Sequence, residues 1–141
     1  MLIFPGFLLN NKAKISMRAQ IRLVKTKDFI RTNAEGVLNL EESRQVLSQL
    51  SVLNTPDNLH DLLIDIRQAV SSLSLSDIYE IVHELSVKRE SFRRQIAVLL
   101  GPKNDLDKAR FMEMCANNRG FNVNIFDSFE DAIMWLMEDE D

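Results

Sequence analysis

The sequence is poor in the residues that hold metals and close disulfides, with one cysteine, Cys115, and two histidines, His60 and His83. A single cysteine cannot build an intramolecular disulfide framework and fits a reducing compartment, so we expect a cytoplasmic protein. One cysteine and two histidines are also too few for a structural zinc site. Cys115 lies among apolar residues of an expected helix, so we interpret it as a small buried side chain and the histidines as loop or surface residues.

Glycine is equally scarce, with four residues at positions 6, 36, 101 and 120. Their spacing contains neither the G-x-G-x-x-G pattern of dinucleotide-binding folds nor the Walker loop that cradles phosphates. The histidines and the cysteine assemble into no recognisable catalytic triad. The sequence therefore predicts a protein that is not an enzyme, with no catalytic residue, no cofactor and no metal ion.

A strong excess of one charge and a long hydrophobic run are also missing. The chain has 17 lysine and arginine residues against 21 aspartate and glutamate residues, a net charge of −4 that disfavours nonspecific binding to nucleic acid or an anionic membrane. The apolar start is broken by Pro5 and Gly6 and is shorter than the roughly 20 residues of a membrane-spanning helix. We expect neither a nucleic-acid partner nor stable membrane insertion.

The domain organisation is simple. A length of 141 residues, with 45% hydrophobic and 27% charged residues, is typical of one globular domain. We expect an N-terminal extension at residues 1–16, followed by a single α/β domain at residues 17–141. Either the extension packs on the domain as an extra arm, or Met17 is the natural start.

Within that domain, strand and helix patterns alternate. The segments 20–25 and 29–32 predict a hairpin, after which Gly36 breaks the strand pattern. Asn39 predicts the cap of a helix that stops near Pro56. Three further strand-helix units follow. Their strands are expected at 62–66, 96–100 and 123–126, and their helices after Ser74, at 106–118 with Gly120 as the closing residue, and after Asp127 or Ser128.

This order predicts an α/β sandwich whose mixed sheet of four or five strands begins with a hairpin and carries about four helices. The segments 62–66 and 96–100 are almost continuously apolar, which is typical of strands buried on both faces, so we expect them as neighbours in the centre of the sheet. In the last helix we expect Trp135 to be partly buried. If Met134 and Met137 are exposed beside it, the three side chains form an apolar patch that would favour a homodimer, and the sequence leaves the oligomeric state open.

Polar side chains gather where the expected strands end, which is where sites form in open α/β sheets. The candidate ligand or partner site consists of Asp65, Arg67, Ser72, Ser74, Ser76 and Lys103. Exposed amides at the helix N-termini would favour an anion there. A purely structural interpretation competes, in which Ser74 caps its helix and Asp65 pairs with Arg67 or a neighbouring amide.

Three stretches of the chain together resemble the SpoIIAA-like family, small bacterial domains with the STAS/CRAL-TRIO type of fold. They are LLIDIRQAVSSLSLSDIYEIVHEL, RQIAVLLGP and ARFMEMCANNRGFNVNIFDSFEDAIMWL, and the resemblance spans about residues 17–137. It implies a non-enzymatic interaction or regulatory module with a protein partner. In the antagonists that name the family, a serine in an Asp-Ser-Ser-Gly loop is phosphorylated. Here the loop 71–77 lacks that tetrapeptide, with Ser74 and Ser76 nearest in position, so the resemblance does not carry the switch over.

Two alternative functions stay open. The CRAL-TRIO side of the resemblance implies a small apolar, lipid-like ligand between sheet and helices. The stretch LLIDIR also resembles a receiver strand that ends in a phosphoacceptor aspartate, here Asp65. A receiver needs an acidic pair after its first strand to hold magnesium, and the segment 20–28 offers none, so this alternative ranks last.

Overall fold

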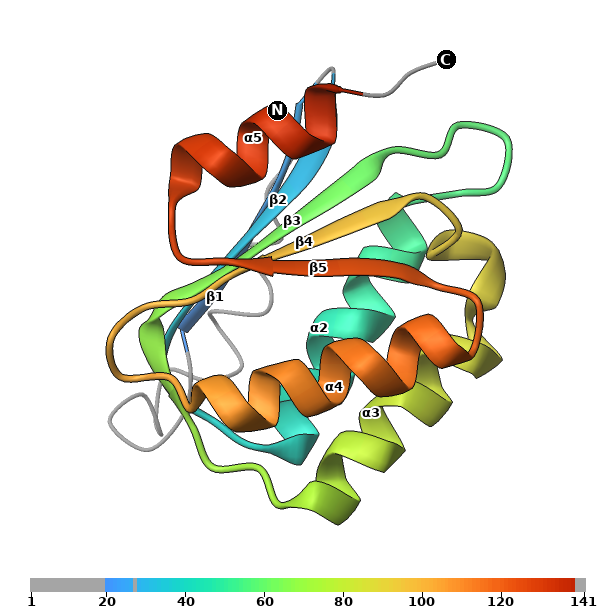
Figure 1. The fold of residues 1–141 in the computed structure, drawn as a ribbon. Coiled ribbons are helices and arrows are strands. Elements are labelled where there is room, and N and C mark those ends of the chain that lie inside the picture. Colours follow the sequence, from blue (N-terminus) through green and yellow to red (C-terminus); the bar gives the residue numbers. More distant parts are fainter. Residues whose placement is uncertain (1–19, 27, 139–141) are drawn as a thin grey trace.

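A five-stranded mixed sheet forms the centre of the protein (Figure 1). The computed structural model describes residues 20–26 and 28–138, and the expected N-terminal extension lies outside them. The strands stand in their sequence order, β1-β2-β3-β4-β5, with β1 antiparallel to β2 and every other pair parallel. Their bounds are β1 Gln20–Lys25, β2 Phe29–Leu38, β3 Asp61–Ser71, β4 Gln95–Leu99 and β5 Asn122–Phe126. The predicted fold class is confirmed.

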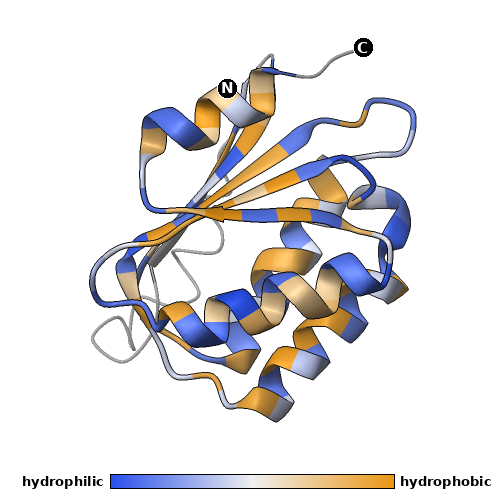
Figure 2. Cartoon of the chain, viewed as in Figure 1, coloured by the Kyte–Doolittle hydropathy of each residue, from blue (hydrophilic) through white to orange (hydrophobic). Residues whose placement is uncertain are grey.

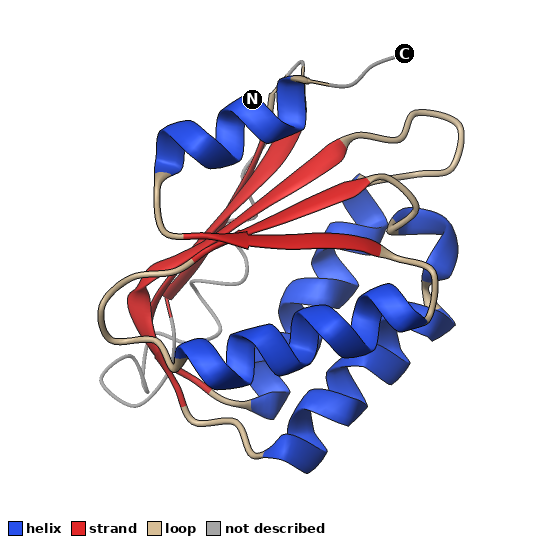
Figure 3. Ribbon diagram, viewed as in Figure 1, coloured by secondary structure: helices blue, strands red, loops and turns tan. Residues whose placement is uncertain are grey.

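The helices form two unequal layers on the sheet (Figures 1 and 3). Each of α2, α3 and α4 connects two neighbouring parallel strands, and right-handed crossovers in one direction place all three on the same face. The last helix, α5, follows the edge strand β5 and covers the opposite face. The bounds are α2 Leu40–Leu53, α3 Leu75–Val87, α4 Leu106–Asn118 and α5 Phe129–Met137, with a short 3-10 turn, η2 Arg89–Ser91, before β4.

Short polar residues fix where these four helices begin. The side chain of each N-cap residue accepts a hydrogen bond from the backbone amide three residues later, which satisfies one of the unpaired amides of the first turn. The caps are Asn39, Ser74, Asp105 and Ser128. The predicted caps at Asn39 and Ser74 are confirmed, and Ser128 caps α5 in preference to Asp127.

The core lies on both sides of β3 and β4, which explains their apolar sequences. The two strands pair in parallel and neither is at an edge, so the expected central position is confirmed. Side chains alternate between the layers: Leu62 and Ile96 pack in the main core under α2, α3 and α4, while Leu63 and Ala97 pack under α5. Figure 2 shows hydrophobic colouring along the central strands and in bands along the helices that cover them.

Two predicted strand ends are wrong. The strand expected at 29–32 continues through Gly36 to Leu38 as β2, and β3 runs to Ser71 instead of stopping at residue 66. The register between the strands shifts between Asn33 and Glu35, and Gly36 takes a positive φ of 88°. Backbone pairing between β2 and β3 extends both strands past the point where their apolar pattern fades.

The apolar face of α5 confirms the expected position of Trp135. Ala132 and Leu136 are fully buried against the sheet, and the partly buried Trp135 ring lies 5.6 Å from the ring of Phe126. Met134 and Met137 are exposed. The homodimer suggested for this surface stays a prediction.

The close approach of Gly101, just after β4, to the backbone of β3 can be tested by substitution. A Cβ atom at Gly101 would lie 2.6 Å from the carbonyl oxygen of Arg67 in β3 and 2.9 Å from its Cα. Backbone cannot rotate away as a side chain can, so Gly101→Ala should lower the free energy of unfolding by about 3 kcal/mol in urea denaturation.

Gly120→Ala is the matched control. Gly120 has a φ of +94°, and a Cβ there would meet only the end of the Arg89 side chain at 3.5 Å. The free energy of unfolding of this variant should fall by only about 1 kcal/mol, because alanine is strained in the left-handed backbone conformation of Gly120. Equal losses in the two variants would contradict the role assigned to the close approach at Gly101.

Candidate functional site

Asp65 is the centre of a polar cluster on the α5 side of the sheet. Its Oδ1 accepts hydrogen bonds from the Arg67 backbone amide at 3.1 Å and Nε at 3.0 Å. Its Oδ2 accepts from Arg67 Nη2 at 2.8 Å, Arg31 Nη2 at 3.0 Å and Asn33 Nδ2 at 3.3 Å. The guanidinium groups of Arg31 and Arg67 also lie 5.1 and 5.8 Å from the centre of the Phe129 ring, at the start of α5.

These contacts keep Asp65 ionised inside the sheet. Burial by itself raises the pKa of this carboxyl, but the hydrogen bonds from Arg67 and Arg31 more than offset it, so the pKa lies below its ordinary value. The hydrogen bond to Asp65 in turn raises the pKa of Arg67. Asp65 does not lie at a strand end, as one expectation had it. It lies inside β3 and accepts hydrogen bonds from Arg67, Arg31 and Asn33, which agrees with the structural interpretation that Asp65 pairs with Arg67.

The serine loop forms a separate group at the start of α3. Ser74 Oγ accepts the Asp77 amide at 3.1 Å, and the Asp77 side chain accepts the Ser74 amide at 3.0 Å, which makes a reciprocal capping box. Ser76 lies 3.2 Å from Ser74, oxygen to oxygen, and Ser72 is exposed. The predicted cap at Ser74 is thus confirmed.

The sheet separates the residues of the candidate site. Asp65 and Arg67 contact each other beside α5, while Ser74 and Ser76 contact each other at the start of α3, in the opposite layer. No hydrogen bond or ion pair between described residues joins the two groups. Lys103 is exposed in the turn after β4. That these six residues serve one ligand or partner stays a prediction.

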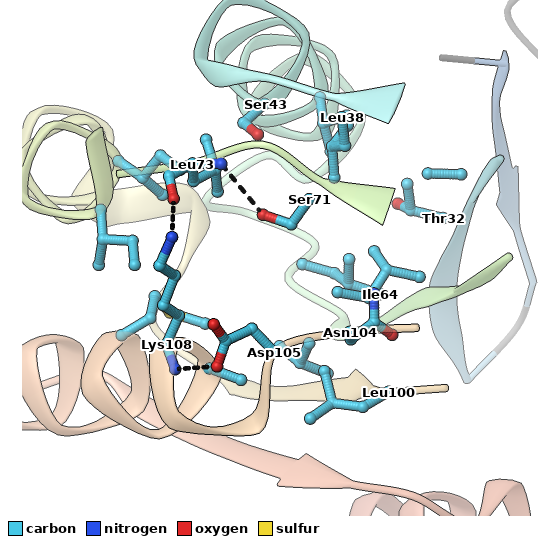
Figure 4. Close-up of a pocket in the computed structure, with 18 of the residues that line it drawn as sticks. Thr32, Leu38, Ser43, Ile64, Ser71, Leu73, Leu100, Asn104, Asp105 and Lys108 are labelled. Carbon is cyan, nitrogen blue, oxygen red and sulfur yellow. Dashed lines mark hydrogen bonds between the residues drawn. The ribbon is translucent and has the colours of Figure 1, made fainter. Parts of the chain in front are cut away.

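A cavity of about 150 Å³ lies between the sheet and the layer of α2, α3 and α4 (Figure 4). Its walls are almost entirely apolar and come from β2, β3 and β4 on one side and the three helices on the other. Thr32 of β2 and Lys108 of α4 also line it. The resemblance implied an apolar ligand between sheet and helices, but the sequence analysis named none of the residues that line this space, because its walls use the same apolar residues as an ordinary core.

Sequence reasoning also missed two members of the Asp65 cluster, Arg31 and Asn33. Both lie on β2, more than thirty residues before Asp65, and reach it only because β2 and β3 pair in the observed register. The available signal was that Arg31 and Asn33 alternate with the less polar Ile30, Thr32 and Ala34, which places them on the other face of the strand. Among residues 20–26 and 28–138, no group of three or more histidine, cysteine, aspartate or glutamate side chains could hold a metal ion. No helix in the same part of the chain is long and apolar enough to cross a membrane.

Replacing Asp65 by asparagine tests the electrostatic role of the cluster. The variant leaves two guanidinium groups without their carboxylate, but their side chains remain 32% and 38% exposed. We therefore expect the free energy of unfolding to fall by about 2 kcal/mol at pH 7, which is less than the fall expected for a fully buried ion pair.

The stabilisation by Asp65 should depend on pH, because only the ionised carboxylate pairs with the two arginines. Because the folded-state pKa of Asp65 is lowered, its stabilisation is complete above its unfolded pKa of about 4 and is lost as the pH falls through the folded value. The difference between wild type and Asp65→Asn should therefore shrink as urea denaturation is repeated below pH 4. Asp57→Asn, at an exposed loop position, is the control. A difference that stays constant from pH 7 to pH 2 would contradict this account.

The capping box gives a second test. Ser74→Ala removes the oxygen that accepts the Asp77 amide, so the free energy of unfolding should fall by about 1 kcal/mol. Ser72→Ala, an equal change at an exposed residue outside the helix, should change it by less than about 0.5 kcal/mol. The same loss in both variants would show that the cap is not the cause.

Solved structures similar in fold to this chain include an uncharacterized protein and two anti-sigma factor antagonists. An uncharacterized protein of the DUF3478 family with a SpoIIAA-like fold, from Shewanella loihica PV-4, is 22% identical, with a TM-score of 0.53 over 84% of this chain and 93% of its own. The anti-sigma factor antagonist SpoIIAA in its unphosphorylated form is 13% identical, with a TM-score of 0.54 over 85% and 100%. An anti-sigma factor antagonist from Mycobacterium paratuberculosis is 12% identical, with a TM-score of 0.53 over 86% and 96%.

No protein-family model and no curated protein sequence matches the chain. The likeness is therefore one of fold, and it extends over nearly the whole length of each of the three structures. The order of strands, the hairpin start and the placement of the helices agree with the expected architecture. The chain has the SpoIIAA-like, or STAS, fold.

Proposed function

We propose that this protein is a non-enzymatic STAS-like interaction module of the cytoplasm that binds a protein partner through the outer face of α3. Two anti-sigma factor antagonists share its fold, and both are named for opposing another protein, an anti-sigma factor. At 12–13% identity this likeness supports the class of function and not the identity of the partner. The observation that carries the proposal is the exposed apolar surface of α3.

That surface is a stripe of residues spaced four apart along the helix. Leu75, Tyr79 and Val87 are 52%, 49% and 64% exposed, and the exposed His83 completes the row. Residues four apart lie above one another on one helix face, so the three apolar side chains form a line. The opposite face of α3 already supplies Ile78, Val82 and Leu85 to the core, so the stripe is not needed for packing.

The neighbouring helix α4 widens the stripe into a patch. The Tyr79 ring meets the Phe111 ring edge to face, with centroids 5.5 Å apart and planes at 88°. Leu106 and Met114 of α4 are also exposed, at 50% and 53%. Exposed apolar side chains with aromatic residues among them favour a protein-binding surface.

The serine loop adjoins one end of this surface. Ser74 and Ser76 are exposed and flank Leu75, the first residue of the stripe. A phosphate there would lie at the N-terminus of α3, where the helix dipole tolerates negative charge, and would change the charge beside the patch. Phosphorylation of this loop stays a prediction. Asp65 is a poor phosphoacceptor by comparison, because both its carboxylate oxygens already accept hydrogen bonds from Arg67.

A partner can be identified by photo-crosslinking in cells, with a benzophenone amino acid at Tyr79 and, as the control position, at the exposed Met134 on the other side of the sheet. The protein crosslinked from Tyr79 is then purified and titrated calorimetrically. The double variant Leu75→Gln/Tyr79→Gln should bind it at least tenfold more weakly, since few central apolar residues dominate such interfaces.

Met134→Gln/Met137→Gln is the matched control, because it removes a pair of apolar side chains from α5 that are even more exposed than Leu75 and Tyr79. Its affinity should equal that of the wild type. Equal affinity of the α3 variant and the wild type, or crosslinks from Met134 alone, would overturn the assignment of α3 as the docking face.

A further inference from the structure

The cavity under α2, α3 and α4 contains one polar atom that the fold leaves unsatisfied. Thr32 is only 1% exposed, and no residue that the structure describes donates to or accepts from its Oγ1. A buried hydroxyl without a partner costs about 1–3 kcal/mol, so such groups are rare and need an explanation. In Figure 4 this hydroxyl is on the side of Thr32 that faces the other labelled residues of the cavity.

The other polar side chains of the cavity wall are already engaged. Ser43 Oγ donates to the Asn39 carbonyl, and Ser71 Oγ accepts from the Leu73 amide. Asn104 bonds to the Gly101 amide and the Ala69 carbonyl, Asp105 accepts the Lys108 amide, and Lys108 Nζ donates to the Leu73 carbonyl at 2.7 Å. Among the polar side chains of the described wall, Thr32 Oγ1 is therefore the buried atom that has no hydrogen bond at all and would gain its first one from a guest molecule.

From this geometry we infer that the cavity is a binding site for a compact, mostly apolar molecule with one hydrogen-bonding group, which pairs with Thr32 Oγ1. The volume of about 150 Å³ fits a single aromatic ring or a short branched chain, on the order of six to ten non-hydrogen atoms. A full-length lipid needs a larger pocket, so this ligand class is narrower than a lipid-transfer domain would take. The inference does not depend on the proposed docking face of α3.

The chemistry of the walls decides against water as the natural occupant. A buried water needs two to four polar partners, whereas Thr32 Oγ1 is a single unpaired group and the residues beside it in the sheet, Ile64, Ala34 and Val98, offer only carbon. An apolar ring that carries one hydroxyl satisfies Thr32 and contacts the carbon walls at once. A phenol has this composition.

The experiment compares two probes that differ by one hydroxyl group, p-cresol and toluene, titrated into the full chain and followed by backbone amide NMR shifts. Both should shift the amides of β2, β3 and α4 that line the cavity, and p-cresol should bind about threefold to tenfold more tightly, from the added hydrogen bond. In Thr32→Val, which keeps the shape and removes the hydroxyl, that advantage should disappear while toluene binds as before. Thr55→Val, the same change on an exposed loop, should leave both affinities unchanged.

A second variant fills the space. Ala109→Leu in α4 adds carbon to the cavity wall and should abolish the shifts from both probes. The unliganded Thr32→Val protein should also melt at an equal or higher temperature than the wild type, because it no longer buries an unpaired hydroxyl. No shift of the lining amides up to the solubility limit, equal affinity of the two probes for the wild type, or an unchanged cresol advantage in Thr32→Val would overturn the inference.

Discussion

The structure depends on one strand, β3, that is held between two parallel neighbours and covered on both faces. Its alternate side chains face different layers: Leu62 and Ile64 pack toward α2, α3 and α4, while Leu63 and Asp65 lie toward α5. A carboxylate in such a strand is stable only with cationic donors close by. Arg31 from β2 and Arg67 from β3 itself supply these donors. Both guanidinium groups also contact the Phe129 ring, so the cluster connects the paired strands β2 and β3 with α5.

The same alternation divides the functional chemistry between two sides of the molecule. The α5 side holds an ion-pair cluster whose carboxylate oxygens are fully engaged, which suits stability better than ligand exchange. The opposite side holds the serine loop, the apolar stripe of α3 and the cavity. Partner binding on the surface and ligand binding beneath it would then use the same helix, α3. Its inner face contributes Ile78 and Ile81 to the cavity wall, and its outer face carries Tyr79.

The local sequence determined the elements and their order. Caps such as Asn39 and Ser74, the apolar runs of β3 and β4, and the small buried Cys115 are readable because each depends on near neighbours or on burial alone. Fold class follows from these elements, since connections between parallel neighbours are right-handed. The helical spacing also places Trp135 next to its core neighbours Ala132 and Leu136.

Tertiary structure alone decided the length of the strands, the partners of Asp65 and the cavity. Strand pairing extended β2 through Gly36 and β3 to Ser71, against the local pattern. Arg31 reached Asp65 through the register of two strands, which depends on the whole sheet. The unsatisfied hydroxyl of Thr32 arises from how three helices pack over the strands. Helix and strand signals come from residues close in the chain, whereas these features come from residues brought together from far apart, and a single sequence does not specify such contacts.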